Sequence, residues 1–193
     1  MDRRLLAWAH ASRRPGSPPR RLWLFTDARR MPDPRPAAAR LPRGLAGVVL
    51  RHDGEPGRAA LGRDLARICR ARRLILVVAG DASLAARLGA GVHLRGGQWP
   101  GPIRIRRRCV TSSAHDAVEL RRAWRAGAEL AFLAPAFATA SHPDASGLGS
   151  LRWLRLARQA RLPVAPLGGI DGSSIHRLPR GLCAGLGAIA ALG

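Results

Sequence analysis

The sequence predicts an α/β fold, a (β/α)8 TIM barrel in a short version with some abbreviated helices. Eight short apolar runs rich in Val, Leu and Ile recur along the chain, and such runs are typical of strands that are buried on both faces. Helical patterns lie between several of these runs. The 193 residues suffice for one domain but are at the short end for this barrel. An open, doubly wound sheet is the alternative, and it needs fewer strands.

The predicted strands are short and evenly spread over the chain. In chain order they are residues 22–26, 47–50, 74–78, 91–94, 108–111, 130–134, 163–167 and 185–189. Because strands alternate with helices, we expect a parallel sheet, and eight parallel strands favour closure into a barrel.

Helices are indicated at 58–70, 116–126 and 150–159, where apolar residues recur three or four positions apart. Asp81 and Asp116 are predicted to accept hydrogen bonds from the free N–H groups at helix starts. The helices are therefore long after some strands and short after others.

Two connections are predicted to lack a full helix. The prolines of 31–36 exclude a helix directly after the first strand, and the segment 96–102, rich in Gly and Pro, excludes one after the fourth strand. These are the abbreviated parts of the predicted barrel.

Residues 1–20 are expected to be a basic, poorly ordered N-terminal segment, and residues 21–193 a single barrel domain. The apolar stretch near the start is short for a signal peptide and is interrupted by His10. No apolar run reaches the roughly 18 residues that span a membrane. The sequence therefore predicts a cytoplasmic protein without a membrane partner.

The net charge of +21 suggests that the protein could bind nucleic acid. All 33 basic residues are Arg, and the chain has no Lys, Asn or Tyr, so the GC-rich codons of a GC-rich genome explain much of the excess. The densest cluster, at 104–108, has no interleaved aromatic residues to stack on bases. We expect no specific nucleic acid, and binding to polyanions only as a low-salt side effect.

The three cysteines, Cys69, Cys109 and Cys183, are far apart in the sequence and show no metal-binding spacing. They are expected to be reduced and mostly buried, and zinc is not expected. The absence of Lys excludes Schiff-base chemistry on a protein lysine.

Chemistry in such a barrel takes place at the carboxyl ends of the strands, where the βα loops converge. The side chains expected there come directly after the predicted strands. They are Asp27, Arg51, His52, Asp53, Gly80, Asp81, His93, Ser113, His115, Thr139, Ser141, His142, Gly168, Gly169 and Ala190.

Two of these segments suggest anion binding. Thr139, Ser141 and His142 follow the sixth strand and offer hydroxyls and an imidazole, and a polar surface loop is the alternative. Gly168 and Gly169 follow the seventh strand, where glycines let the backbone approach a phosphate, and an ordinary tight turn is the alternative.

The residues expected to act in catalysis are Arg51, His115 and His142 of the loop after the sixth strand. Arg51 can hold a carboxylate or phosphate through its forked guanidinium, although a solvated surface arginine is equally consistent. His115 can move protons near neutral pH, and its alternative role is to help start the helix that Asp116 caps. His93, inside GVHL, is more consistent with a packed barrel residue.

The motifs together resemble the thiamine phosphate synthase/TenI family over about 170 residues. The segments that carry the resemblance are GAGVHL at 89–94, SAHDAVEL at 113–120, GAELAFLAPAFATASHP at 127–143, GLG at 147–149, PVAPLGGI at 163–170 and GLGAIAAL at 185–192. The resemblance implies a (β/α)8 barrel and a small phosphorylated heterocycle, a thiazole phosphate, as ligand. Gly168, Gly169 and the last strand's loop, with Ile189 and Ala190, would hold its phosphate.

The resemblance also implies roles for single residues. Thr139 and Ser141 match the family's loop hydroxyls, and Ser113 matches a serine of the fifth strand. Arg51 matches the arginine of a Gln-x-Arg-x-Lys motif, and His115 falls on the histidine that transfers protons in TenI.

Departures from the family pattern are concentrated on charged positions. The Gln and Lys of Gln-x-Arg-x-Lys are Val49 and Asp53, the Asn-Asp pair after the third strand is Ala79-Gly80, the second metal-binding Asp is Gln98, the loop lysine is His142, and the last strand's serine is Ala190. Because Gly80 and Gln98 replace the Asp ligands, no cofactor is predicted, and Mg²⁺ is disfavoured.

By resemblance, the broad function is thiamine biosynthesis. TenI-like thiazole tautomerisation, an isomerase activity with His115 as acid and base, is favoured over the transferase reaction that makes thiamine phosphate. A non-catalytic, ligand-binding or regulatory relative is the alternative, and a basic polyanion-binding protein is a third. A homo-oligomer stays open.

Overall fold

The computed structural model describes residues 2–11, 21–103, 108–139 and 147–193. Its strands form one sheet in the order β7-β6-β5-β4-β3-β2-β1-β8, and all seven neighbouring pairs are parallel. The strands are β1 Arg21–Phe25, β2 Ala46–Leu50, β3 Ile75–Ala79, β4 Gly91–Leu94, β5 Val110–Ala114, β6 Leu130–Leu133, β7 Val164–Pro166 and β8 Gly185–Ala188.

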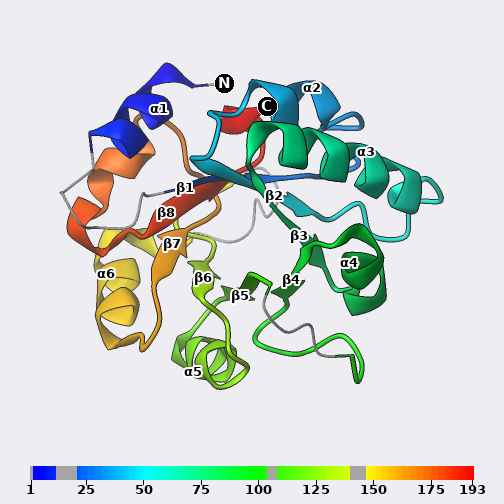
Figure 1. The fold of residues 1–193 in the computed structure, drawn as a ribbon. Helices are drawn as coiled ribbons and strands as arrows, with labels where there is room; N and C mark the ends of the chain where they lie inside the picture. Colours follow the sequence, from blue (N-terminus) through cyan, green and yellow to red (C-terminus); the bar gives the residue numbers. More distant parts are fainter. Residues whose placement is uncertain (1, 12–20, 104–107, 140–146) are drawn as a thin grey trace.

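The two ends of this sheet meet and close it into a barrel (Figure 1). The N–H of Ala184, just before β8, donates to the carbonyl oxygen of Val164 in β7 at 2.8 Å. Val164 also forms a parallel bridge with Cys183. The predicted (β/α)8 barrel is therefore confirmed, and all eight predicted strands are present within a few residues of their predicted bounds.

Helices pack around the outside of the barrel. They are α1 Arg3–His10, α2 Arg35–Arg40, α3 Arg58–Arg72, α4 Ala82–Leu88, α5 Ala117–Arg125 and α6 Gly149–Gln159, with short 3₁₀ turns η1 Ser174–Arg177, η2 Arg180–Leu182 and η3 Ala190–Leu192. Asp81 and Asp116 cap α4 and α5 as predicted, accepting from the N–H groups of Leu84 and Glu119 at 2.8 Å each.

Two boundaries differ from the prediction. Strand β5 covers 110–114 rather than 108–111, so the serines at 112 and 113 belong to the strand itself. Helix α2 begins inside the proline-rich segment at Arg35, because Pro36 occupies the first turn, where a missing N–H costs nothing. The described residues after β4, 95–103, contain no helix, as expected.

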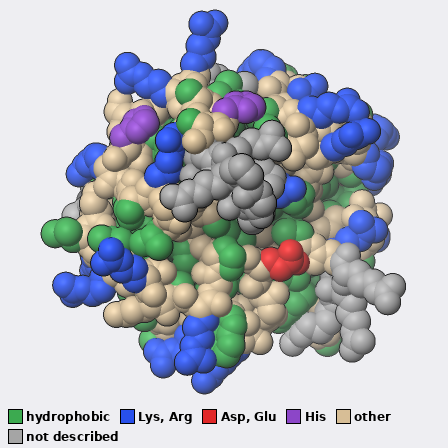
Figure 2. Space-filling model, turned by 60° about the vertical axis from the view of Figure 1, so that its left-hand side comes forward, with side chains coloured by type: hydrophobic (Ala, Val, Ile, Leu, Met, Phe, Trp, Pro, Cys, Tyr) green, Lys and Arg blue, Asp and Glu red, His purple; other side chains and the backbone are tan. Residues whose placement is uncertain are grey.

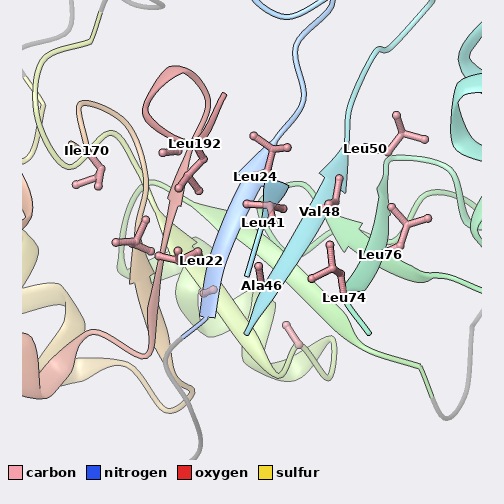
Figure 3. Packing of buried hydrophobic residues seen from close by; sticks show 14 of the residues in the cluster. Leu22, Leu24, Leu41, Ala46, Val48, Leu50, Leu74, Leu76, Ile170 and Leu192 are labelled. Atoms are coloured by element: carbon pink, nitrogen blue, oxygen red, sulfur yellow. The ribbon is translucent and has the colours of Figure 1, made fainter. Parts of the chain in front are cut away.

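Alternate residues of each strand face two different layers. Leu22 and Leu24 of β1 belong to the large cluster between the strands and the helices, part of which Figure 3 shows. Trp23 and Phe25 point the other way, into the barrel, where Phe132 of β6 meets both rings edge-on at centroid distances of 5.6 and 4.8 Å. The interior of the barrel is therefore a packed aromatic and aliphatic core.

The expectation of a poorly ordered segment at 1–20 is wrong for its first part. Residues 3–10 form helix α1, which buries Leu5 and Trp8 in the cluster that surrounds the strands. Residues 12–20 lie outside the described residues. The apolar spacing of Leu5 and Trp8 is helical, and packing of that face stabilises a helix that would be marginal in isolation.

Asp2 ties this helix to the barrel. Its carboxylate accepts from the N–H groups of Arg4 at 2.8 Å and Gly172 at 2.7 Å, and its own N–H donates to the carbonyl of Ala191 at 2.8 Å. The start of α1 is therefore held by the loops that follow β7 and β8. Within the described ranges, no helix is long and apolar enough to cross a membrane.

Candidate active site

The carboxyl ends of the parallel strands bring most of the predicted site residues to one end of the barrel. They lie there in three groups, which follow β2 to β4, β5 and β6, and β7 and β8. In the barrel order, β3 and β7 are four strands apart and lie on opposite sides of the opening.

Gly168 and Gly169 form a tight turn after β7, with φ values of 86° and 65° that favour glycine. A Cβ added at Gly169 would lie 2.5 Å from the carbonyl oxygen of Ala138, so no larger residue fits. The N–H of Phe137 donates to the carbonyl of Gly168 at 3.1 Å and fixes the turn against the chain after β6. Within the described residues, the N–H groups of both glycines have no acceptor.

Ile189 and Ala190 follow β8, the neighbour of β7 across the closure of the barrel. Their N–H groups also donate to none of the described residues. Ile189 is half-buried and Ala190 is exposed, so this stretch of backbone is accessible. Free N–H groups at two adjacent strand ends are the arrangement that binds a phosphate.

His115 lies just after β5, and its imidazole is exposed. Its Nδ1 is 2.7 Å from the carbonyl oxygen of Ala134, at the end of β6. Because a carbonyl oxygen only accepts, Nδ1 carries the proton in this contact. The neutral ring therefore presents its other nitrogen, Nε2, as a proton acceptor.

The backbone around His115 is fixed by the start of helix α5. Its N–H donates to a carboxylate oxygen of Glu119 at 2.9 Å, while the N–H of Glu119 donates to Asp116 at 2.8 Å. The two bonds satisfy one free N–H group of the first turn of α5 and the N–H group of the residue before the cap. Both of the roles considered for His115, helix start and proton transfer, are thus compatible.

The predicted hydroxyl ligands divide into three cases. The Ser113 hydroxyl accepts from the N–H of Gly96 at 3.3 Å, so it supports the loop after β4. Thr139 lies at the described end of the loop after β6 and is half-buried. Ser141 and His142 lie outside the described residues, and their roles remain predictions.

Arg51 is held at the end of β2 by a chain of hydrogen bonds. Its N–H donates to the Thr26 hydroxyl at 3.0 Å, and that hydroxyl contacts Nδ1 of the buried His52 at 2.9 Å. Nε2 of His52 lies 3.4 Å from the carbonyl of Pro32, which only accepts. His52 therefore carries its proton on Nε2, and the Thr26 hydroxyl donates to Nδ1.

His93 lies inside the barrel, as the packed interpretation predicted. Its Nδ1 is 2.8 Å from the Thr111 hydroxyl, and its ring meets Phe25 edge-on at 5.4 Å. Burial above all, and then the charges of Arg51 and Arg95, lower the pKa of His93 to about 3. His93 is therefore a neutral core residue beneath two guanidinium groups.

Sequence reasoning missed the charged cluster over the ends of β2, β3 and β4. Arg95, just after β4, pairs with the carboxylate of Asp53. Arg58, at the start of α3, lies 3.3 Å from Asp53 and 3.8 Å from Asp81, and its guanidinium donates to the carbonyl of Ala79. In a chain with 33 arginines, the sequence alone does not distinguish these two from the rest.

A divalent cation does not fit this cluster. Its two carboxylates, Asp53 and Asp81, already share the Arg58 guanidinium, whose positive charge would repel a bound cation. One oxygen of Asp81 also caps helix α4. Among the described residues, no group of three or more His, Cys, Asp or Glu side chains could hold a metal ion.

A cavity of about 440 Å³ lies at the other end of the barrel, lined by the starts of β3 to β5 and the end of α3. Cys69 and Cys109 are in its wall. Burial raises the pKa of both thiols to about 12, which keeps them protonated and unreactive. The cavity is remote from the strand ends that carry the candidate residues.

Comparisons with known proteins identify the family of the chain. A family model described as thiamine monophosphate synthase matches residues 24–192. A thiamine-phosphate synthase from Geobacillus thermodenitrificans is 32% identical over 175 residues, which cover 82% of this chain and 78% of that protein. One from Synechococcus sp. is 32% identical over 136 residues, but the chain spans only 38% of that relative's length.

The fold has solved counterparts. A thiamine phosphate pyrophosphorylase from Pyrococcus furiosus superposes with a TM-score of 0.73 at 21% identity, over 89% of this chain and 86% of that one. This likeness supports the barrel, while the match over residues 24–192 identifies the family. The chain therefore belongs to the thiamine monophosphate synthase/TenI family of thiamine biosynthesis.

Proposed function

We propose that this protein binds a phosphorylated thiazole and tautomerises a thiazole carboxylate phosphate, with His115 as general acid and base. The observation that carries the proposal is the contact between Nδ1 of His115 and the carbonyl oxygen of Ala134. It fixes the ring in one tautomer and leaves Nε2 free to accept a proton at the barrel opening.

The reaction needs only the movement of a proton. Nε2 takes a proton from one position of the bound heterocycle and returns it to another, so substrate and product have the same composition. No oxidant, metal or second substrate is consumed. The imidazole ends each cycle in its starting state.

The phosphate would be bound by backbone N–H groups. Gly168, Gly169, Ile189 and Ala190 offer four N–H groups without an acceptor among the described residues. Their strands are adjacent, so one phosphate can accept from both loops. The Thr26 hydroxyl accepts from the N–H of Arg51 and so fixes the backbone of this residue just after β2. We assign the Arg51 guanidinium to a carboxylate of the ligand.

Condensation of a thiazole phosphate with a pyrimidine diphosphate is the second candidate. The names of the curated relatives favour it, since they are thiamine-phosphate synthases. The chemistry of the described residues favours it less, because Gly80 and Gln98 supply no carboxylate where the resemblance expects the two metal-binding Asp residues.

The face of the molecule drawn in Figure 2 gives the polyanion-binding alternative no support. On the face drawn in Figure 2, the arginine side chains are spread around the edge of the molecule. A polyanion site needs a continuous basic stripe.

Isothermal calorimetry with the thiazole carboxylate phosphate and with hydroxyethylthiazole phosphate tests binding, and NMR of the first compound follows its tautomerisation. We expect binding by the wild type and by His115→Ala, and turnover by the wild type alone. Binding without turnover by the wild type would indicate a non-catalytic relative. Product formation only with the pyrimidine diphosphate present would establish the synthase reaction instead.

A further inference from the structure

The cavity at the amino-terminal end of the barrel combines an apolar wall with a basic mouth. Its volume of about 440 Å³ is within the range of about 300–1,000 Å³ that small-molecule sites occupy. Buried or half-buried aliphatic side chains form much of its wall, namely Leu74, Ile75, Leu76 and Leu88. This wall favours a ligand with an apolar body, because contact removes apolar surface from water.

Two arginines supply the polar part of the wall. Arg70, at the end of α3, and Arg108, just before β5, both line the cavity and are exposed. Neither guanidinium has a hydrogen-bond or ion-pair partner among the described residues, and none of the described residues that line the cavity is acidic. Both positive charges are therefore available to a ligand.

Both guanidinium groups lie close to the cavity. Burial raises the pKa of Cys69 to about 12, and the charge of Arg70 acts against this rise. Because Cys69 is part of the cavity wall, the charge of Arg70 lies near the interior. Nη2 of Arg108 lies 3.7 Å from the position of a Cβ added at Gly89, at the end of α4. The two charges thus approach the cavity from different elements.

The backbone carbonyl groups beside the cavity are already hydrogen-bonded. The carbonyl oxygen of Cys69 accepts from the N–H of Leu74 at 2.8 Å, and that of Ala85 accepts from the N–H of Ala90 at 2.9 Å. These bonds occupy acceptors at the ends of α3 and α4. The polar groups that remain for a ligand are the guanidinium donors, and they select an acceptor with negative charge.

A shallower hollow of about 160 Å³ lies between α3 and α4 and shares Arg70 with the cavity. Arg63, Arg67 and Arg87 also line this hollow. Of these three, only Arg67 has an acidic partner among the described residues, Asp64 at 2.6 Å. The positive charge around the mouth would attract an anion towards the cavity.

We infer that this cavity is a binding site for a small amphipathic anion, an apolar chain or ring with a single carboxylate or phosphate group, which Arg70 and Arg108 bind. The guanidinium fork matches either oxyanion in two-point geometry, and the apolar body lies against the aliphatic wall. The inference does not rest on the proposed function, because the starts of β3 to β5 are at the opposite end of the barrel from His115.

Calorimetry with hexanoate, octanoate and decanoate tests the apolar wall and the charges together. At about 0.15 M salt, which screens non-specific attraction to a basic surface, we expect saturable binding whose affinity rises about fourfold for each added CH₂ group. Octanamide has the same chain without the charge and should bind at least about tenfold more weakly than octanoate. Equal affinities along the series, or for octanoate and octanamide, would overturn the inference.

Arg70→Gln locates the binding. The affinity for octanoate should fall about tenfold in this variant and in Arg108→Gln, because each loses a charge-assisted hydrogen bond. Arg152→Gln, which removes an exposed arginine of α6, is the matched control and should leave the affinity unchanged. Equal affinities in Arg70→Gln and Arg152→Gln would place the ligand elsewhere and contradict the site.

A final arm separates this cavity from the barrel opening. Ala190→Asp places a negative charge beside the Gly168–Gly169 turn and should weaken thiazole phosphate binding without changing octanoate binding. A lower octanoate affinity in Ala190→Asp would mean that the anion binds at the opening, and the inference would be wrong. If octanoate binds as expected but thiazole phosphate does not bind, the proposed function fails and this inference stands. Tighter binding of octyl phosphate than of octanoate would identify the preferred group as a phosphate, and the reverse a carboxylate.

Discussion

Nδ1 of His115 lies 2.7 Å from the carbonyl oxygen of Ala134, which joins the residue after β5 to the end of β6. The contact determines which ring nitrogen is protonated and which way the ring faces. The predicted proton transfer depends on that orientation as much as on the presence of an imidazole.

His115→Asn is expected to lower kcat about 10²- to 10⁴-fold, the usual contribution of a general acid–base group. An asparagine amide can replace Nδ1–H as donor to Ala134, but it has no counterpart of the basic Nε2. Ligand affinity should stay within about twofold. A steady-state tautomerase assay with parallel calorimetry measures both, and retention of full activity would rule out His115 as the base.

Ala190→Asp is expected to weaken thiazole phosphate binding by at least about tenfold, because a carboxylate would repel the phosphate from the free N–H groups. Ala190 is exposed, so the substitution does not disturb the core. Ala86→Asp on helix α4 introduces the same charge at another exposed alanine and serves as the control. Equal affinities in the two variants would refute phosphate binding at this turn.

The free energy of unfolding should decrease as the pH is lowered, because the pKa of His93 is lower in the folded state than in the unfolded state. Burial lowers the pKa of His93 to about 3, below the value of 6.5 for a free histidine. Between these two values the unfolded state binds a proton that the folded state does not, so stability is lost as the pH falls from 6.5 towards 3, by up to about 1.4 kcal/mol per pH unit.

Urea unfolding at several pH values measures this slope. In His93→Gln the slope should decrease by roughly that amount, while His176→Gln, at an exposed 3₁₀ turn, keeps the parent's slope. An unchanged slope in His93→Gln would show that other groups dominate the acid response.

The turn after β4 should tolerate no side chain at Gly97. Its φ is 75°, and an added Cβ would collide with the backbone nitrogen of Ala123. Gly101 has a φ of 84° but no described atom within 4 Å of such a Cβ. Gly101→Ala should therefore lower the free energy of unfolding only by the left-handed backbone penalty of about 1–2 kcal/mol. Gly97→Ala should lower it by at least about 1 kcal/mol more, because of the collision.

Chemical denaturation of both variants compares these costs under identical conditions. If both substitutions lower the free energy of unfolding by the same amount, the close packing of this turn on α5 does not contribute to stability.

The barrel itself could be predicted because its strands are buried on both faces. Leu24 and Phe25 contact different layers but are both apolar, so a strand such as β1 appears in the sequence as an uninterrupted apolar run. The end of β5 was not predicted, because Ser112 and Ser113 are polar. Both lie in the strand, and their hydroxyls accept hydrogen bonds from the loop after β4.

The candidate site was predictable where residue type and position agreed. His115 and the Gly168–Gly169 turn follow strands directly and have few chemical alternatives. Arg58 and Arg95 were not predictable, because an arginine in this composition carries little information and their convergence depends on the three-dimensional placement of α3 and the β4 turn. Helix α1 was missed because its short amphipathic face depends on tertiary packing.

The hydrogen bond between Asp2 and Ala191 brings both ends of the described chain together, as Figure 1 also shows. A short linker could therefore join them, and a new opening in the exposed stretch 101–103 would leave every strand pair intact. In such a circular permutant the strands would be synthesised in a different order around the same closed ring. The spatial neighbourhood of the strands, and not their order of synthesis, would then define the barrel.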